Sequence, residues 1–427
     1  AYPAWVEGSK MGMDKLKVHM NQSAEVNLMY ASKYASIANY WKNRQGMIDA
    51  LTQFGTAKTK AAQEAKFNKW ANKKENKAKY GNVVATINNY YALTNEKAKH
   101  DNYLMTLLRS SSYGTIARSL GRQLEAYANA NEEKRKQMAP ALSQMADEFF
   151  TEVYIPAEKD VLAGQLNLYA TKATGYGIAP FVAEIGKANN NDFTAYVNAA
   201  FELSIFSSAE KIKAFLLVPN QAAVANDPLV KLSNELLNHY NAKSDEIAKA
   251  QNDYSAAFRL LVEGLRESKI ATILYPDANS TLRLTYGKVR ALPADKRNDA
   301  KVNNYTTMEG LVKKYKKGDA EFDLPTKILD MQKARNYGRY ADKDGTLHVN
   351  FLTDNDITGG NSGSPVLNGK GELIGLAFDG NIEAMAGDVI FDPKLQRTIN
   401  VDVRFVLWVI DTYAGAKHLV DEMTIVK

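Results

Sequence analysis

The feature that most constrains the fold of this chain is a change of residue pattern near residue 270. From about Asp14 to Glu267 the chain is poor in glycine and proline and rich in alanine, lysine and leucine. Its apolar residues recur at steps of three and four, as in Leu104, Leu107 and Leu108. Because this spacing places apolar side chains on one face of an α-helix, the first part is predicted to be a bundle of several helices.

Two helix starts can be read from the same part of the sequence. Ser207 or Ser208 precedes a glutamate and an apolar run, which is typical of a helix cap. Asp227 precedes Pro228, and these residue types favour the cap and the first turn of a helix. No fixed repeat period is present, so a repeat solenoid is disfavoured.

After about Ile270 the pattern changes to strands and tight turns. The segment "GTLHVNFLT" follows the turn pair Asp344-Gly345, and Asn368-Gly369 separates two apolar runs. Such glycine pairs next to alternating or apolar segments predict strands joined by hairpin turns.

Two further segments favour strands. In "STLRLTYGKVRAL", Leu282, Leu284 and Tyr286 alternate with polar residues, which predicts a half-buried strand. The segment "RTINVDVRFVLWVIDTYAG" predicts a strand followed by a short helix that ends near Gly415.

These patterns predict an α+β chain with two domains. Residues 1–269 are expected to form a helical domain, and residues 270–427 an antiparallel β-barrel. A length of 427 residues is consistent with two or three domains.

Composition excludes several classes of function. The chain contains no cysteine, which excludes disulfides, thiol nucleophiles and cysteine-bound zinc. No apolar run approaches the length of a membrane span. The net charge of +6 is concentrated locally, since Thr56 to Tyr80 holds eight lysines against two glutamates. Because Phe67 and Trp70 lie at helical spacing within it, this stretch is predicted to be a solvated helix face rather than a nucleic-acid site.

One short segment imitates a calcium loop. "DKDGT", Asp342 to Thr346, resembles the front of such a loop, but Thr353 stands where the closing carboxylate belongs. A turn is therefore the preferred interpretation, and no metal or other cofactor is expected.

The segment Gly360-Asn361-Ser362-Gly363-Ser364-Pro365 has the composition of a nucleophile loop. Glycine on both sides allows a tight backbone turn and close approach of a substrate. Such a turn can direct the amides of Gly360 and Ser362 at one point, where they would stabilise an oxyanion. The loop lies between predicted strands, which favours a barrel-type serine peptidase over an α/β-hydrolase. A Gly/Ser surface turn is the alternative.

A serine nucleophile needs a base, and the five histidines offer no good candidate. His19, His100 and His239 lie in the predicted helical part, and His418 follows the last predicted helix. His348 lies on the strand before Ser362, whereas two-barrel peptidases supply the histidine and aspartate from the other barrel. The base is therefore expected to be absent from these residues.

Four segments together resemble a known family. They are "YASKYASIANYWKN" from Tyr30, "PDANSTLRLTYGKV" from Pro276, "TGGNSGSPVLNGKGELIGLAFDGN" from Thr358 and "INVDVRFVLWVIDTYAGAKHLVDEM" from Ile399. They resemble the C-terminal part of bacterial serine exopeptidases of the dipeptidyl-peptidase 7 and 11 family. The resemblance implies a chymotrypsin-like double barrel with an inserted helical lid, of which this chain holds the lid and the second barrel half.

The resemblance also assigns roles to individual residues. Ser362 matches the nucleophile, and Gly360 matches the oxyanion position. Asn39 and Asp379 match residues that hold the substrate's free amino group, about two residues from the cleaved bond. Gly380 stands where members that prefer Asp or Glu carry an arginine, which implies an open, apolar specificity pocket.

Further expectations concern activation, partners and location. Asn361 replaces the aspartate that pairs with a newly cut N-terminus in many trypsin-like enzymes, so no such zymogen step is expected. The partners expected are a peptide with a free N-terminus, the missing N-terminal barrel segment and a second copy of the chain in a homodimer, without nucleic acid. The chain is expected to be inactive alone, and the family implies a periplasmic or cell-surface location.

Two other functions fit parts of the sequence. A glutamyl-endopeptidase-like protease shares the "GNSGSPV" motif, although the helical part does not suit so compact an enzyme. A non-catalytic peptide-binding module would use the helical part alone. Turnover of dipeptidyl substrates separates these interpretations.

Overall fold

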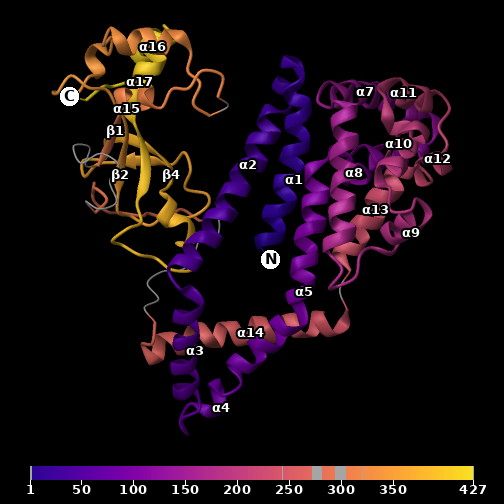
Figure 1. The fold of residues 1–427 in the computed structure, drawn as a ribbon, viewed down its shortest axis with the longest axis horizontal. Coiled ribbons are helices and arrows are strands. Elements are labelled where there is room, and N and C mark those ends of the chain that lie inside the picture. Colours follow the sequence, from indigo (N-terminus) through magenta and orange to yellow (C-terminus); the bar gives the residue numbers. More distant parts are fainter. Residues whose placement is uncertain (1, 243, 272–280, 294–303, 320, 427) are drawn as a thin grey trace. The chain divides into compact units, whose positions relative to one another are not determined.

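The computed structural model describes residues 2–242, 244–271, 281–293, 304–319 and 321–426. The chain divides into two compact units. The helical unit comprises residues 1–48 and 57–274, and the sheet unit comprises residues 49–56 and 275–427 (Figure 1).

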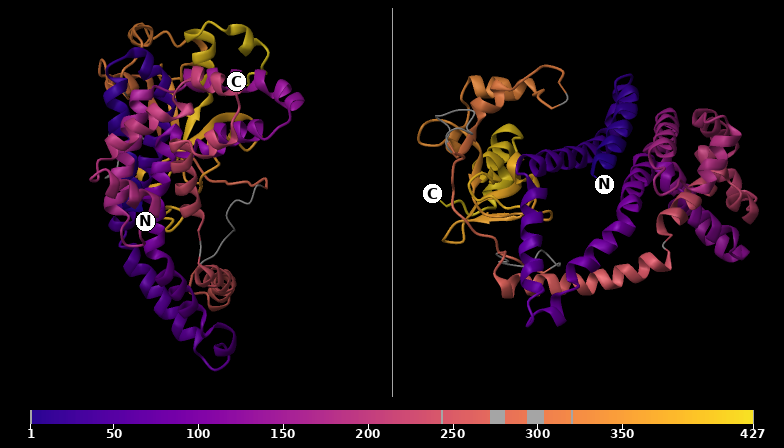
Figure 2. Two further views of the ribbon diagram at one scale, coloured as in Figure 1. Left: turned by 90° about the vertical axis from the view of Figure 1, so that its right-hand side faces the viewer. Right: turned by 60° about the horizontal axis from the view of Figure 1, so that its bottom comes forward.

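Long helices and a cluster of shorter ones make up the helical unit, which confirms the predicted helical character of this part (Figures 1 and 2). Its main helices are α1 (Tyr2–Met20), α2 (Ala24–Gln53), α3 (Thr56–Ala71), α4 (Lys77–Tyr80), α5 (Val83–Ser110), α6 (Arg122–Ala128), α7 (Glu132–Thr151), α8 (Ile155–Lys172), α9 (Pro180–Ala188), α10 (Phe193–Leu203), α11 (Ala209–Leu217), α12 (Gln221–Ala225), α13 (Pro228–Asn241) and α14 (Asp245–Ser268). A 3₁₀ turn, η1 (Ser112–Thr115), and a π-helical turn, η2 (Ala117–Gly121), continue α5, and a further 3₁₀ turn, η3 (Ile205–Ser207), precedes α11.

Both predicted helix starts are confirmed. The side chain of Ser208 accepts a hydrogen bond from the amide of Lys211 at the start of α11. The carboxylate of Asp227 accepts hydrogen bonds from the amides of Leu229 and Val230 at the start of α13. Each cap satisfies amides that have no partner within the helix, which fixes where the helix begins.

The core of the helical unit is formed by the apolar stripes of α5, α8, α10, α11 and α13. Leu104, Leu107 and Leu108 are all buried in it, as their spacing predicts. In α3, Phe67 is buried while the neighbouring lysines are exposed. The lysine-rich stretch is thus a solvated helix face, as predicted.

A fully buried carboxylate joins three parts of the helical unit. Glu158 of α8 accepts hydrogen bonds from Tyr30 Oη at 2.9 Å, Ser111 Oγ at 2.8 Å and the amide of Ser112 at 2.7 Å. The ammonium of Lys33 lies 3.2 Å from its Oε1. Because a buried charge is tolerated where it is paired and hydrogen-bonded, this arrangement fixes the first third of α2 against α8 and η1.

The sheet unit contains one antiparallel sheet in the order β1-β2-β5-β4-β3. Its elements are β1 (Tyr305–Thr307), α15 (Met308–Lys313), α16 (Thr326–Lys333), η5 (Gly338–Tyr340), β2 (His348–Thr353), β3 (Pro365–Leu367), β4 (Leu373–Gly380), η6 (Ile382–Ala386), β5 (Thr398–Asp402), α17 (Val403–Trp408), η7 (Val409–Tyr413) and α18 (Lys417–Asp421). The helices α15 to α17 pack at one end of the unit around Trp408 (Figure 1).

The hairpin between β3 and β4 forms where Asn368-Gly369 predicts it, with one difference. The amide of Gly371 donates to the carbonyl of Asn368, and Gly371 has a φ of 80°. This is a three-residue hairpin loop in which the second glycine takes the left-handed conformation. The Asp344-Gly345 turn is also confirmed, with Gly345 at a φ of 75°.

Two predictions about the sheet are wrong. Residues 281–290 form no strand. Their one β-type pairing is an isolated bridge between Val289 and Thr353, and the side chain of Leu284 is 88% exposed. The predicted barrel is an open five-stranded sheet with β1 and β3 at its edges. The edge strand β1 was not predicted, because its three residues are too short to show an alternation.

None of the helices in the part of the chain that the structure describes has the length and apolar character needed to span a bilayer.

Candidate functional site

The loop between β2 and β3 is fixed to β4 by backbone hydrogen bonds. The amide of Gly363 donates to the carbonyl of Ala377 at 2.7 Å, and the amide of Ala377 donates to the carbonyl of Ser364 at 2.9 Å. Inside the loop, the amide of Asn361 donates to the carbonyl of Thr358. The loop therefore continues the β3–β4 ladder and holds Ser362 at the end of the sheet.

Two glycines in this loop adopt backbone conformations that other residues rarely take. Gly360 has a φ of 103° and Gly363 has a φ of 81°. Left-handed backbone of this kind costs an ordinary residue roughly 1–2 kcal/mol. These values explain why the glycines flank Ser362, and they confirm the tight turn that the sequence predicts.

Ser362 is exposed, and among the described residues of the sheet unit no basic side chain is hydrogen-bonded to its hydroxyl. Its Oγ donates to the carbonyl oxygen of Phe378 at 3.3 Å. A backbone carbonyl cannot remove the proton from a serine hydroxyl, so this contact orients the side chain without making it a nucleophile.

The amides on either side of Asn361 remain available as donors. Neither Gly360 nor Ser362 donates its backbone N–H to an acceptor among the described residues. By contrast, the amides of Asn361, Gly363 and Ser364 all make bonds inside the unit. Two free amides within one tight turn are the donors that an oxyanion requires.

A β-bulge in β4 shapes the floor beside Ser362. Ala377 pairs with Asn400 and Asp379 pairs with Ile399, so Phe378 is the extra residue. Bulges redirect side chains and often occur beside functional sites. The sheet unit thus brings together Ser362, Gly360, the carbonyl of Phe378, and the neighbouring Asp379 and Gly380.

Asp379 and Gly380 end β4 at the exposed side of the bulge. The Asp379 carboxylate is exposed and accepts a hydrogen bond from the amide of Gly380 at 2.7 Å. A Cβ at Gly380 would lie 2.8 Å from the Cβ of Ala384, closer than side chains normally approach. The absence of a side chain at this position therefore matches the local packing.

The side chain of Asn361 is used inside its own loop. Its Oδ1 accepts a hydrogen bond from the amide of Thr358 at 3.1 Å. Thr358 in turn donates its hydroxyl to Asp388 Oδ1 at 2.9 Å. Asn361 therefore braces the loop.

Asn39 belongs to the helical unit, whereas Ser362 belongs to the sheet unit. Asn39 lies on α2, two turns beyond the segment that Glu158 holds, and its side chain is exposed. No hydrogen bond joins its amide to the residues of this unit that the structure describes.

His348 is engaged elsewhere in the sheet unit. Its Nδ1 lies 3.1 Å from Arg404 Nη2 and 3.5 Å from Asp342 Oδ2, and its ring stacks on Tyr305 with centroids 3.9 Å apart. Ser362 Oγ contacts the carbonyl of Phe378, and the sheet register places Phe378 level with Phe351 and Leu352 of β2. His348 lies three to four residues away from that level, roughly 10–13 Å along the strand, which is too far for proton transfer.

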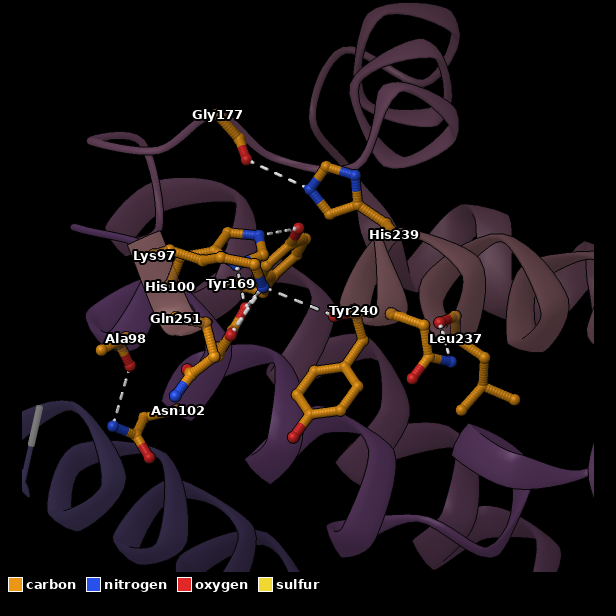
Figure 3. Close-up of polar contacts among 12 residues, drawn as sticks. Lys97, Ala98, His100, Asn102, Tyr169, Gly177, Leu237, His239, Tyr240 and Gln251 are labelled. Atoms are coloured by element: carbon orange, nitrogen blue, oxygen red, sulfur yellow. Dashed lines mark hydrogen bonds and ion pairs between the residues drawn. The ribbon is translucent and has the colours of Figure 1, made fainter. Parts of the chain in front are cut away.

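In the helical unit, His19 Nε2 lies 2.8 Å from Asp160 Oδ2, and Figure 3 shows the partners of His100 and His239. His100 is buried, with Nε2 2.8 Å from Tyr169 Oη and Nδ1 3.0 Å from Asp101 Oδ1. The ring of His239 lies 5.0 Å from that of His100, and its Nε2 lies 3.4 Å from the carbonyl of Gly177. Burial, and secondarily the neighbouring His100, lowers the pKa of His239.

The two carboxylates of the acidic turn near Asp342 have partners within the sheet unit. Asp344 accepts hydrogen bonds from the amide and hydroxyl of Thr346, and Asp342 pairs with Arg404 at 2.6 Å. These interactions lower the pKa of both carboxyl groups. Among the described residues, no three His, Asp or Glu side chains are grouped to hold a metal ion.

Sequence reasoning identified Ser362 and its flanking glycines but missed Phe378. The sequence signal for this bulge is an interrupted alternation of inward-facing and outward-facing residues in the segment "LAFDG". An extra residue in a strand shifts every later side chain to the opposite face of the sheet. A bulge of this kind becomes visible only when the register against β5 is known.

Comparison with known proteins places this chain among the peptidases. A family model described as Peptidase S46 matches residues 1–425. The chain therefore belongs to the peptidase S46 family, which confirms the resemblance inferred from its motifs.

Individual relatives refine this assignment. The chain is 53% identical over 429 aligned residues to a dipeptidyl-peptidase 7 from Capnocytophaga gingivalis. This alignment covers 100% of the chain and 59% of the relative. It is 33% identical to an Asp/Glu-specific dipeptidyl-peptidase from the same organism, across 96% of this chain and 57% of the relative. The chain thus spans less than two thirds of the length of these relatives.

Solved structures support the same fold. The crystal structure of Porphyromonas endodontalis DPP11 in complex with the dipeptide Arg-Glu matches with a TM-score of 0.85 and 28% identity. The match covers 99% of this chain and 60% of that chain.

Proposed function

We propose that this chain is the larger part of a serine exopeptidase that releases dipeptides from the N-termini of peptides. The observation that carries the proposal is the loop of residues 358–364, in which Ser362 lies beside two free amides. Membership of the S46 family and similarity to dipeptidyl-peptidases support the same conclusion.

In this proposal Ser362 Oγ attacks the carbonyl carbon of the second residue of the substrate. The bond from Oγ to carbon forms as the carbonyl oxygen becomes an oxyanion, which accepts hydrogen bonds from the amides of Gly360 and Ser362. Loss of one such donor typically raises the barrier by about 3–4 kcal/mol. The proton of Oγ passes to a base and then to the leaving amine, which departs as the C–N bond breaks. Water, deprotonated by the same base, then attacks the ester formed on Ser362, which releases the dipeptide and restores the serine hydroxyl.

In this proposal the base comes from polypeptide outside these 427 residues. His348 is committed to Arg404, Asp342 and Tyr305, and Ser362 donates to a backbone carbonyl. The relatives are longer than this chain, which leaves room for a segment that supplies the histidine and aspartate. In this proposal that segment completes a chymotrypsin-like double barrel with the open sheet, and the chain alone is inactive.

Two side chains would hold the free amino group of the substrate. Asp379 supplies a carboxylate beside the serine loop, and Asn39 supplies a neutral amide from α2. An ammonium group enclosed without partners would cost several kcal/mol, so the anchor that the family resemblance assigns to Asp379 and Asn39 would select dipeptides.

Gly380 would determine the residue preferred before the cleaved bond. With neither side chain nor charge at this position, a buried acidic side chain would have no cationic partner, so hydrophobic residues are favoured. The higher identity to dipeptidyl-peptidase 7 than to the Asp/Glu-specific relative supports a preference for residues other than Asp and Glu.

The family also supports proposals about location and assembly. We expect the complete protein to be periplasmic or exposed on the surface of a bacterium, and to act as a homodimer. Fractionation of cells and sedimentation of the purified protein test these two expectations.

A turnover assay tests the proposed reaction. The complete enzyme, with its upstream segment, should release naphthylamine from Leu-Phe-naphthylamide faster than from Leu-Asp-naphthylamide. Ser362→Ala should reduce kcat by at least about a thousandfold, whereas the matched variant Ser364→Ala, two residues away, should retain most activity. Full activity of Ser362→Ala would refute the assignment of the nucleophile.

The same assay separates the alternatives. Turnover by the 427 residues alone would refute the proposal that the base lies elsewhere. Cleavage of internal bonds in a peptide with a blocked N-terminus would favour the glutamyl-endopeptidase interpretation. Binding of peptides by the complete protein without any cleavage would favour a peptide-binding module.

A further inference from the structure

The helical unit contains a cavity of about 790 Å³. Its walls come from α1, α2, the end of α5 with η1, and the end of α7. A volume of this size lies within the range of small-molecule sites, roughly 300–1,000 Å³. None of its lining residues has a role in the proposed reaction.

Two uncommitted charges of opposite sign line this cavity. Arg109 and Glu152 are both exposed, and neither makes an ion pair or a side-chain hydrogen bond with the described residues. They do not pair with each other. Lys33 also lines the cavity, but its charge is balanced by the buried Glu158 at 3.2 Å. The cavity therefore offers one free cation and one free anion to a ligand.

An aromatic wall lies beside the free cation. The guanidinium carbon of Arg109 lies 5.8 Å from the centre of the Trp5 ring, and Tyr40 meets Trp5 edge-on with centroids 6.5 Å apart. The indole N–H of Trp5 is buried and has no acceptor among the described residues. A buried donor without a partner is costly, and Trp5 is one of the residues that line the cavity.

Apolar and hydroxyl groups complete the lining. Met29 and Ile37 present apolar surface from α2, while Ser110, Ser111 and Ser112 line the opposite wall with hydroxyl groups already bonded to Gln165 and Glu158. Mostly apolar walls with a few polar groups that fix orientation are typical of ligand sites.

We propose that this cavity binds a short zwitterionic peptide with an apolar side chain. The ligand carboxylate pairs with Arg109 and accepts from Trp5 Nε1, its ammonium pairs with Glu152, and its side chain packs on Trp5 and Tyr40. Paired charges of both signs distinguish such a ligand from a simple anion or an apolar molecule. The choice of a dipeptide rests on the proposed function, but the site itself does not.

The fluorescence of Trp5 provides a direct test. The dipeptide Leu-Phe, added to the 427-residue protein, should change tryptophan fluorescence saturably, and Trp5→Phe should remove that change. Arg109→Met and Glu152→Gln should each weaken binding by at least about tenfold, as expected for a lost charge-assisted hydrogen bond. Arg118→Met and Glu125→Gln, which alter exposed charges outside the cavity, should bind as the original protein does.

Ligand analogues keep the test independent of how each variant folds. Leu-Phe-amide lacks the carboxylate and N-acetyl-Leu-Phe lacks the ammonium, so each should bind at least about tenfold more weakly to the unaltered protein. Equal binding of either analogue, or unchanged binding by Arg109→Met, would overturn the proposal.

A last comparison separates this site from the proposed active site. Asp379→Asn should leave the Trp5 signal unchanged. Loss of that signal in Asp379→Asn would assign the binding to the active site and overturn the inference. Dipeptidyl turnover by the complete enzyme, measured separately, tests the proposed function, so failure of either can be recognised without the other.

Discussion

The two units hold their candidate residues in different ways. In the helical unit, α2 carries Asn39 and is fixed by a buried carboxylate, Glu158, which binds Tyr30 and Lys33. In the sheet unit, the loop that carries Ser362 is exposed and is fixed by backbone hydrogen bonds to β4. The position of α2 is thus fixed by a buried polar network. The position of the serine loop is fixed by backbone hydrogen bonds to β4 and by glycines that adopt a left-handed conformation.

This difference shows how stability and function are distributed. The core of the helical unit extends through many helices, whereas the core of the sheet unit is a smaller cluster around Trp408. The serine loop lies outside that cluster. Substitutions in the loop should therefore change the site with little effect on stability, whereas substitutions at Glu158 or Trp408 should affect stability first.

The largest effect is expected for Trp408→Ala. Trp408 is fully buried in the sheet unit, and its indole N–H donates to the carbonyl of Asn336 at 2.9 Å. Removing a large buried aromatic side chain costs about 3–5 kcal/mol. Hydrogen exchange should show lost protection in β2, β4 and β5 but unchanged protection in α5 and α8. The exposed Tyr286→Ala serves as control, with a change below about 0.5 kcal/mol.

A smaller effect, confined to the other unit, is expected for Glu158→Gln. The amide removes a charge that accepts hydrogen bonds from Tyr30, Ser111 and Ser112, which should cost about 2–3 kcal/mol. Urea unfolding followed by circular dichroism measures the loss in the helices. The exposed Glu184→Gln should have no measurable effect. Equal stability of the two variants would show that the buried carboxylate does not hold α2.

An effect on the loop alone is expected for Gly363→Ala. At a φ of 81° an alanine costs roughly 1–2 kcal/mol, which should displace the loop from β4 rather than unfold the unit. Turnover by the complete enzyme should therefore fall at least about tenfold, with a small change in melting temperature. Gly369→Ala, in the neighbouring hairpin where φ is negative, is the matched control and should leave both unchanged.

The smallest effect concerns pH. The pKa of His239 is lowered in the folded helical unit, so the unfolded chain binds more protons below about pH 6.5, and stability falls as pH decreases from there. In the sheet unit the pKa of Asp342 is lowered, chiefly by its hydrogen bond from Arg404, so that stabilisation is lost only below about pH 4.

Urea midpoints measured between pH 7 and pH 4 test this difference. His239→Gln should flatten the dependence of the helical unit between about pH 6.5 and pH 5 without altering the sheet unit. An unchanged pH dependence in His239→Gln would exclude this histidine as the titrating group.

Local patterns in the sequence determined a large part of this structure. The apolar stripe of α5, the caps Ser208 and Asp227, and the turn glycine Gly345 depend on residues within a few positions of one another. Local rules of helix periodicity, capping and turn conformation are therefore sufficient for them. The nucleophile loop could be recognised for the same reason, since its glycines are adjacent to Ser362.

The tertiary structure decided the remainder. The alternation of Leu282, Leu284 and Tyr286 predicts a strand, yet a strand forms only where a partner supplies hydrogen bonds, and no partner pairs with these residues in the described part of the chain. The bulge at Phe378 depends on the register against β5, and the cavity beside Trp5 depends on helices far apart in the sequence. Pairing and packing between distant segments carry no local signature, which is why these features required the three-dimensional structure.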